Sequence, residues 1–263
     1  MKALLMDTTL CIACRGCQVA CKQWNRLDAE QTSFFHGGGY QNPAHRSTRT
    51  WNLITFNEVE NGHGMDWVFG RRQCNHCIEP ACVTACPVGA LTKTAEGPVH
   101  YDESRCFGCR YCQVVCPFNA PRFEWNDPNP EIRKCTMCAD RIAMGSEPAC
   151  SQSCTTKALI FGDREELLSL AKERIAKSPN RYVSHIYGEK EAGGACVLYL
   201  AKAPFEKMGF ATGLPDKPFS SEVKTAMAAI PFAITGSALA LGALYWVINR
   251  RLESYKESSE DES

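Results

Sequence analysis

The longest uninterrupted apolar run of the chain lies near its C-terminus. Residues 226–248 give 23 consecutive positions without a charged side chain. As a helix this run is roughly 35 Å long, which is enough to cross the hydrocarbon core of a bilayer. The aromatic pair Tyr245–Trp246 and the basic pair Arg250–Arg251 lie where interfacial anchors are expected. The pattern predicts a linker over residues 204–224, a single transmembrane helix over 225–249 and a polar tail over 250–263.

The charges on either side of this run bear on its orientation. Arg250, Arg251 and Lys256 favour a cytoplasmic C-terminus, although Lys217 and Lys224 on the other side weaken the bias. We therefore expect a single-pass protein of a bacterial or archaeal cell membrane, with its N-terminal domain on the periplasmic or outer face. The cytoplasmic face is the alternative.

Shorter apolar runs predict strands and one amphipathic helix. Asp163, followed by Glu166, matches the capping-box start of a helix that runs to about Lys177. The long segment between Cys21 and Cys74 is rich in glycine and is interpreted as an insertion that contains a hairpin. Its glycines include Gly37, Gly38, Gly39, Gly62 and Gly64. A first strand is predicted in the N-terminal segment MKALLMDTTL (residues 1–10), leading into the Cys11 loop, and further strands are predicted at residues 51–56, 97–101 and 195–200.

Composition changes this picture, because 17 of the 263 residues are cysteine. Sixteen of them fall into four groups of four, and the first and third groups read C-x2-C-x2-C-x3-C. This is the spacing of bacterial ferredoxins, in which three thiolates bind one [4Fe-4S] cluster and the fourth binds its neighbour. We expect the fourth cysteine of each group to begin a helix. The groups are Cys11, Cys14, Cys17, Cys21; Cys74, Cys77, Cys82, Cys86; Cys106, Cys109, Cys112, Cys116; and Cys135, Cys138, Cys150, Cys154.

Two other uses of the cysteines fit the sequence less well. Disulfide scaffolds are usually short, whereas this chain has enough apolar residues to bury a core, and cysteines three apart bridge poorly. Zinc sites use separated C-x2-C pairs. Zinc or a [3Fe-4S] cluster stays open at the fourth group, where eleven residues separate Cys138 from Cys150 and Thr155 replaces the expected proline. Cys196, in an apolar run, is predicted to be a small buried hydrophobe.

Charge and histidine usage narrow the function. The net charge is zero, so there is no basic surface for nucleic acid, and a protein partner or a membrane is expected instead. The pattern of residues 1–10 is not typical of a secretory or twin-arginine leader, so we expect that export would require a partner that carries the signal. No catalytic constellation is evident, and we expect no enzyme activity from this chain by itself. Its histidines are scattered: His36, His45, His63, His76, His100 and His185.

Several segments resemble a known family. CIACRGCQVACKQWN (residues 11–25), CRYCQVVCPFNAPR (109–122) and KCTMCADRIAMGSEPAC (134–150) are similar to the four-cluster iron-sulfur subunit of molybdopterin oxidoreductases. The single C-terminal helix and HIYGEKEAGGACVLYL (185–200) most resemble the beta subunit of membrane-bound respiratory formate dehydrogenase. PFEKMGF (204–210) resembles the membrane-anchored iron-sulfur subunit of nickel-iron hydrogenases. The resemblance covers nearly the whole chain.

The motifs and the resemblance together predict an α+β fold. It is a duplicated bacterial-ferredoxin-like four-cluster domain over residues 1–203, followed by the single C-terminal transmembrane helix. The inner two-cluster unit spans 74–124, and the outer unit combines 1–73 with 125–203. The resemblance implies four ligand sets: Cys11, Cys14, Cys17 with Cys154; Cys135, Cys138, Cys150 with Cys21; Cys74, Cys77, Cys82 with Cys116; and Cys106, Cys109, Cys112 with Cys86.

The function implied is one-electron transfer through four [4Fe-4S] clusters. Electrons pass from a molybdenum- or tungsten-pterin catalytic subunit, which oxidises formate, to a membrane cytochrome b or quinone-reactive subunit. One alternative is the iron-sulfur subunit of a membrane-bound nickel-iron hydrogenase or of another molybdopterin reductase. A more remote one is a zinc-bearing membrane-anchored scaffold. Cations near the clusters are candidates to raise their potentials: Arg15, Arg105, Arg110, Arg133 and Lys134.

Overall fold

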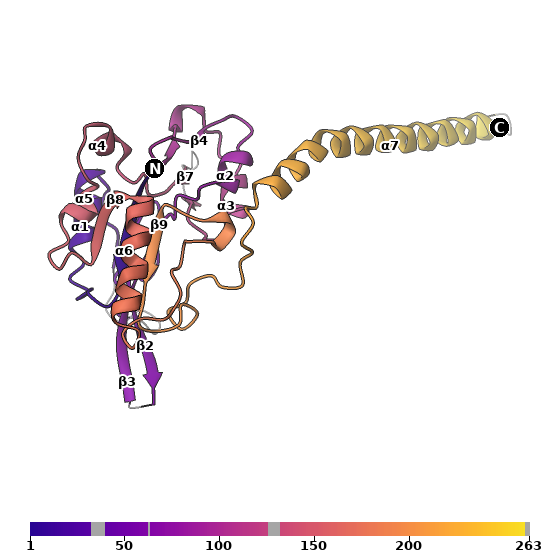
Figure 1. Ribbon diagram of the computed structural model, residues 1–263. Coiled ribbons are helices and arrows are strands. Elements are labelled where there is room, and N and C mark those ends of the chain that lie inside the picture. The colour runs from indigo at the N-terminus through magenta and orange to yellow at the C-terminus, as the bar shows by residue number, and fades with distance from the viewer. Residues whose placement is uncertain (33–39, 63, 126–131, 261–263) are drawn as a thin grey trace. The chain divides into compact units, whose positions relative to one another are not determined.

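The computed structural model describes residues 1–32, 40–62, 64–125 and 132–260 (Figure 1). Gly37, Gly38, Gly39, His36 and His63 lie outside the described residues. The chain divides into two compact units, Met1–Ser220 and Ser221–Ser263. The elements are β1 (Lys2–Asp7), α1 (Gly16–Trp24), β2 (Leu53–Asn61), β3 (Gly64–Arg72), α2 (Ala81–Thr84), β4 (Leu91–Lys93), β5 (Val99–Tyr101), the 3-10 turn η1 (Glu103–Arg105), α3 (Tyr111–Val114), β6 (Arg122–Phe123), β7 (Ile132–Arg133), α4 (Ala139–Ala143), α5 (Ala149–Gln152), β8 (Leu159–Asp163), α6 (Arg164–Lys177), the 3-10 turn η2 (Glu191–Gly193), β9 (Val197–Leu200) and α7 (Ser220–Glu260).

A three-stranded sheet of order β8–β1–β9 forms the core of the first unit. The strand β1 pairs antiparallel with β8 and parallel with β9. The predicted strands at the N-terminus and at 195–200 are thus neighbours, and both are continuous apolar runs because both are buried. Cys196 is fully buried beside this sheet, as predicted.

The helix α6 covers this sheet (Figure 1), and its first turn differs from the predicted capping box. Leu167, Leu168 and Ala171 are the buried side chains that the apolar pattern indicates. The helix runs to Lys177 as predicted, but the Asp163 side chain does not cap it. Its carboxylate instead accepts a hydrogen bond from Lys2 Nζ at 2.8 Å, across the β1–β8 pair.

Three two-stranded hairpins complete the first unit: β2–β3, β4–β5 and β6–β7. The hairpin β2–β3 is the one predicted for the segment between the first two cysteine groups, although β2 runs to Asn61 rather than ending at Phe56. It extends from the body of the unit (Figure 1). The hairpin β4–β5 is fastened to the central sheet, because Lys2 N donates to Glu96 O at 2.6 Å in its turn.

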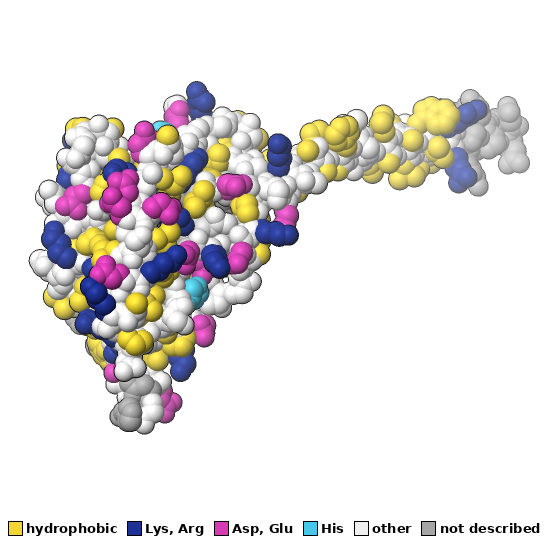
Figure 2. All heavy atoms as spheres, viewed as in Figure 1, with side chains coloured by type: hydrophobic (Ala, Val, Ile, Leu, Met, Phe, Trp, Pro, Cys, Tyr) yellow, Lys and Arg dark blue, Asp and Glu magenta, His cyan; other side chains and the backbone are white. Residues whose placement is uncertain are grey.

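The second unit is one helix, α7, which is longer at both ends than the predicted span of residues 225–249. Within its segment Ser220–Glu253, the most apolar window of 18 residues has a mean hydropathy of 1.8, and none of that window is buried within the molecule. Figure 2 shows hydrophobic side chains along this helix. A helix that is apolar around its circumference and unburied in its own chain has the length and composition of a membrane span. Trp246 lies 5.3 Å from the guanidinium of Arg250.

Candidate iron-sulfur cluster sites

The four cysteine groups share one turn geometry. In each group the residue just before the second cysteine has a positive φ: 54° at Ala13, 48° at His76, 78° at Gly108 and 55° at Met137. Only Gly108 adopts this conformation without steric cost, so three side chains are held in it by their surroundings. The turn directs backbone amides at sulfur, since the N–H groups of Ala13 and Met137 donate to the cysteine two residues earlier at 3.4 and 3.3 Å.

The third cysteine of every group occupies the same place in a helix. Cys17, Cys82, Cys112 and Cys150 are each the second residue of α1, α2, α3 and α5, respectively. The expectation that the fourth cysteine begins the helix is therefore wrong. The tight turn through the first two cysteines leads directly into the first helical turn, which brings the third thiol back beside them.

Three of the four fourth cysteines lie just beyond the ends of these helices. Cys86, Cys116 and Cys154 each follow two residues after a short helix, whereas Cys21 lies within α1. Their sulfurs also accept backbone hydrogen bonds, from Ala90 N at 3.2 Å, Ala120 N at 3.3 Å and Leu159 N at 3.4 Å. Such N–H···S contacts stabilise negative charge on sulfur and so bear on cluster potential.

Thiols from different groups lie close enough to influence one another. Burial, together with the thiolates of Cys150 and Cys138, raises the pKa of Cys21 to about 12. Burial likewise raises the pKa of Cys11, to which Cys154 and Cys14 add. The first group thus approaches the fourth.

The second and third groups approach each other in the same way. Burial raises the pKa of Cys77 well above its usual value, and Cys116, from the third group, adds to the effect before Cys74 and Cys82 do. Burial raises the pKa of Cys112 to about 12, with contributions from Cys109, Cys106 and, from the second group, Cys86.

These environments suit an iron-sulfur cluster better than a single ion. A zinc ion with four thiolates needs sulfurs only about 4 Å apart, since each Zn–S bond is about 2.3 Å long. Within residues 1–32, 40–62, 64–125 and 132–260, no three His, Cys, Asp or Glu side chains converge in that way. In a [4Fe-4S] cluster each thiolate binds a different iron, so the ligands surround a larger object. Buried thiols with raised pKa values also require a nearby metal cation to remain deprotonated.

Two buried side chains near the second and fourth groups are committed to other contacts. His76 is fully buried, and its Nδ1 accepts a hydrogen bond from Val99 N at 2.9 Å. Burial, followed by the nearby Lys134 and Lys93, holds its pKa well below the usual 6.5, so the ring is neutral. Lys134 is 3% exposed, and its Nζ donates to Val99 O at 2.6 Å and to Cys135 O at 3.1 Å.

The other cations singled out from the sequence lie nearer the surface. Arg133 pairs with Glu103 at 2.7 Å, and Arg105, 63% exposed, pairs with Asp102 at 3.3 Å. Arg15 lies over the Phe56 ring, and Arg110 over the rings of Phe123 and Trp125. Of the five candidates, Lys134 is the buried one.

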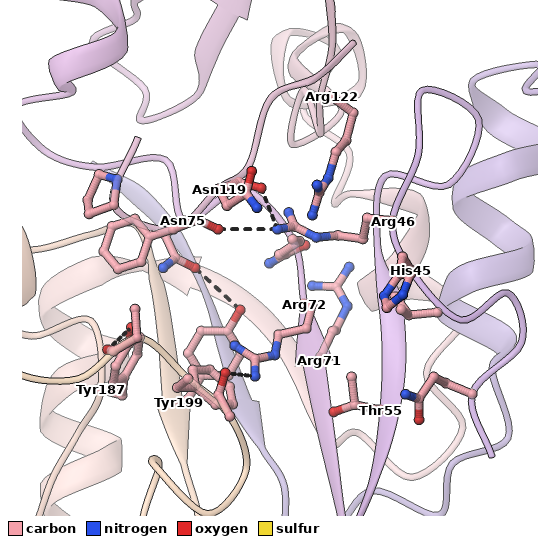
Figure 3. A pocket seen from close by; sticks show the side chains of 18 of the residues that line it. His45, Arg46, Thr55, Arg71, Arg72, Asn75, Asn119, Arg122, Tyr187 and Tyr199 are labelled. Carbon is pink, nitrogen blue, oxygen red and sulfur yellow. Dashed lines mark hydrogen bonds between the residues drawn. The ribbon is translucent and has the colours of Figure 1, made fainter. Parts of the chain in front are cut away.

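The sequence reasoning missed a cavity of about 590 Å³ lined by four arginines (Figure 3). Arg46 binds the carbonyl oxygens of Phe118 and Asn119, and Arg72 those of Met208 and Gly209. Arg71 is fully buried, and none of its three side-chain nitrogens has a hydrogen-bond partner among the described residues. An unpaired buried guanidinium costs several kcal/mol unless an anion lies beside it. The fourth arginine is Arg122.

Comparisons with known proteins agree with the cysteine pattern. Two models of a 4Fe-4S dicluster domain match residues 10–90 and 65–164. The iron-sulfur subunit of formate dehydrogenase-O of Escherichia coli is 37% identical over 246 residues, which cover 90% of this chain and 80% of that subunit. The formate dehydrogenase iron-sulfur subunit of Haemophilus influenzae is 35% identical, and the match covers 99% of this chain and 85% of that subunit. The hydrogenase-2 operon protein HybA of Escherichia coli O157:H7 is also 35% identical, and the match covers 78% of this chain and 71% of HybA.

Proposed function

The chain belongs to the family of formate dehydrogenase iron-sulfur subunits, and from this premise we propose that its sixteen grouped cysteines hold four [4Fe-4S] clusters. It is an electron-transfer subunit that binds [4Fe-4S] clusters, and it is the non-catalytic part of an oxidoreductase complex. The proposed ligand sets are Cys11, Cys14, Cys17 with Cys154; Cys135, Cys138, Cys150 with Cys21; Cys74, Cys77, Cys82 with Cys116; and Cys106, Cys109, Cys112 with Cys86.

The fourfold repetition of one local geometry carries this proposal. Each group combines a positive-φ turn before its second cysteine with a helix that begins one residue before its third. The influence of Cys154 on Cys11, and of Cys116 on Cys77, supports ligands that cross between groups. We therefore propose an inner unit over residues 74–124 and an outer unit over 1–73 and 125–203, with two clusters in each. The clusters of the first and fourth groups are called the outer clusters below.

When bound, such clusters take up and release one electron at a time, and the chain supplies their environment. Backbone amides, such as Ala90 N and Ala120 N, stabilise charge on the ligand sulfurs. The left-handed residues Gly89 and Asn119 directly precede those two amides and fix their direction, so they need not reorganise when an electron arrives. Every grouped cysteine except the exposed Cys14 is buried or half-buried, which limits water at the thiols, and low solvent exposure keeps the reorganisation on electron transfer small.

We further propose the partners and the location. One partner is a molybdenum- or tungsten-pterin subunit that oxidises formate, and the other is a membrane cytochrome b or quinone-reactive subunit. The names of the relatives support the formate-oxidising partner. The length and the exposed apolar surface of α7 support a place in the bilayer beside the membrane partner. The basic residues Arg250 and Arg251, which follow the apolar part of α7, favour the cluster domain on the periplasmic or outer face.

A nickel-iron hydrogenase is the second candidate for the catalytic partner, because a hydrogenase-2 operon protein is 35% identical over 244 residues. Affinity purification of the tagged full-length chain from its native membranes separates the two. Co-purification of molybdenum or tungsten with formate-dependent dye reduction supports the first. Co-purification of nickel with hydrogen-dependent dye reduction supports the second.

Paired serine substitutions test the ligand sets. Cys21→Ser removes a proposed ligand of the cluster that Cys135, Cys138 and Cys150 hold, whereas Cys196→Ser changes a buried thiol outside the four groups. We expect C21S to lose or convert one cluster, so that iron falls from about sixteen to about twelve per chain, and C196S to keep all of its iron. Full iron with unchanged electron paramagnetic resonance signals in C21S would contradict the assignment.

A further inference from the structure

Arg71 lies on β3 between the first and fourth cysteine groups. Its strand partner on β2 is Ile54, whose backbone N–H donates to Gln18 Oε1 at 3.1 Å, and Gln18 directly follows Cys17. Two residues beyond Arg71, the side-chain oxygen of Gln73 lies 4.0 Å from Cys135 Sγ. The hairpin thus places Arg71 next to thiols of both groups.

Among the described residues, the groups that act on Arg71 as anions are cysteine thiolates, which bound clusters would keep deprotonated. Its side chain is fully buried, and Nε, Nη1 and Nη2 are all unpaired among the described residues. Burial acts to lower the pKa of Arg71, but the thiolates of Cys150 and Cys17 outweigh that effect and raise it. Apart from the thiolates, the other group with a marked influence is the phenol of Tyr199, which is neutral because burial raises its pKa to about 12.

We propose that Arg71 is the internal cation that raises the reduction potentials of the two outer clusters, an inference that rests on the proposed function. Each one-electron reduction makes a cluster and its thiolates one unit more negative, so a fixed positive charge beside it favours the reduced form. A buried charge is screened little by water and salt, unlike exposed Arg105, which also has Asp102 as its partner. Arg71 thus acts on electron transfer through the electric field of its charge at the clusters, and it does not bind iron.

Arg72 provides a matched control one residue away. It lines the same cavity, but its guanidinium binds the carbonyl oxygens of Met208 and Gly209 and lies 4.3 Å from the Phe210 ring. The groups that influence its pKa include Tyr199 and Tyr187 and no cysteine. Replacing Arg72 removes the same charge from the same cavity at a site that does not face the thiolates.

The test is a redox titration of the full-length iron-loaded protein, followed by electron paramagnetic resonance, with iron counted in each sample. For Arg71→Gln we expect the reduced-to-oxidised ratio of the two outer clusters to fall at least tenfold at a fixed potential. That change corresponds to a shift of about 59 mV for a one-electron couple. The two inner clusters should change less than threefold, as should all four clusters in Arg72→Gln. Arg71→Lys keeps the charge and should stay within threefold of wild type.

The outcomes separate this proposal from the cluster assignment. Full iron in Arg71→Gln with unchanged potentials overturns the role of Arg71 and leaves the four clusters in place, whereas low iron in the wild type overturns the clusters themselves. If Arg71→Gln loses its iron, the Arg71→Lys variant distinguishes a role for the charge of Arg71 from a role for its shape. Full iron at wild-type potentials in Arg71→Lys supports a role for the charge. Loss of iron in Arg71→Lys as well, with Arg72→Gln fully loaded, shows that the shape of Arg71 is required and overturns the proposal.

Discussion

The buried carboxylate of Asp7 fastens the end of β1 just before the first cysteine group, and its replacement should weaken that group. Asp7 is fully buried, and each of its oxygens accepts two hydrogen bonds. Oδ1 accepts from Thr9 N at 3.0 Å and Thr9 Oγ1 at 2.6 Å. Oδ2 accepts from Arg174 Nη1 at 2.8 Å and Tyr182 OH at 2.9 Å. This network joins the turn leading to Cys11 with the end of α6.

Asp7→Asn keeps the shape but replaces one acceptor oxygen by a donor amide. Either orientation of the amide loses two hydrogen bonds, and Arg174 loses its anionic partner. Charge-assisted hydrogen bonds contribute roughly 1.5–3 kcal/mol each, and breaking a buried pair costs roughly 3–5 kcal/mol. Because the Arg174 side chain is 26% exposed and keeps some hydration, we expect a loss of about 3 kcal/mol. Such a loss makes opening of the region on the order of a hundredfold more frequent.

The assay is the rate at which the iron-loaded protein loses cluster absorbance in mild denaturant, because bound clusters make an equilibrium unfolding energy ill-defined. Asp163→Asn is the control, since Asp163 pairs with Lys2 near the other end of β1 but at the surface. Loss should be much faster in Asp7→Asn and nearly unchanged in Asp163→Asn. Equal rates for the two variants would refute the reasoning.

Three further predictions concern pH, the membrane helix and one turn. In the iron-free protein, the pKa of Cys21 is raised from 9.0 to about 12, so the stability that the neutral thiol contributes is fully present below pH 9 and is lost as pH rises toward 12. Denaturant midpoints measured from pH 7 to 11 should therefore fall in the iron-free protein, and iron binding should abolish the fall. Leu241→Arg puts a charge in the middle of α7 at a cost of about 2.5–3.5 kcal/mol, so the membrane-bound fraction in vesicle flotation should drop, whereas Thr225→Arg, at the helix start, should leave it unchanged. Gly97 has a φ of +123°, and Gly97→Ala would place a methyl group 2.4 Å from Lys2 O, whereas the methyl group of Gly62→Ala would meet open space. The melting temperature should fall in Gly97→Ala and stay unchanged in Gly62→Ala.

The sequence was most informative where spacing alone determines geometry. Three cysteines at intervals of three can surround one cluster only through a tight turn, and the apolar run at 226–248 predicted a long helix, which the structure contains as part of α7. The position of the helices relative to the third cysteine was missed because four-residue helices such as α2 and α3 have no periodicity to detect.

Arg71 escaped prediction for a different reason. In the segment FGRRQC it reads as the polar end of a strand, and adjacent arginines usually indicate solvent. Its burial depends on pairing of β3 with β2 and on the attachment of Ile54 to Gln18, and neither contact is local in sequence. The available signal was a pair of arginines next to Cys74 at the end of an apolar strand. Lys134 was predicted to act near a cluster because it directly precedes Cys135, a relation that sequence does record.

The most direct test of the central claim is the content of iron, acid-labile sulfide and zinc in the anaerobically purified full-length protein. Electron paramagnetic resonance of the dithionite-reduced sample completes it. Four [4Fe-4S] clusters predict about sixteen irons and sixteen sulfides per chain, with signals of interacting reduced clusters. Few irons together with stoichiometric zinc would contradict the account and indicate a metal-stapled membrane scaffold.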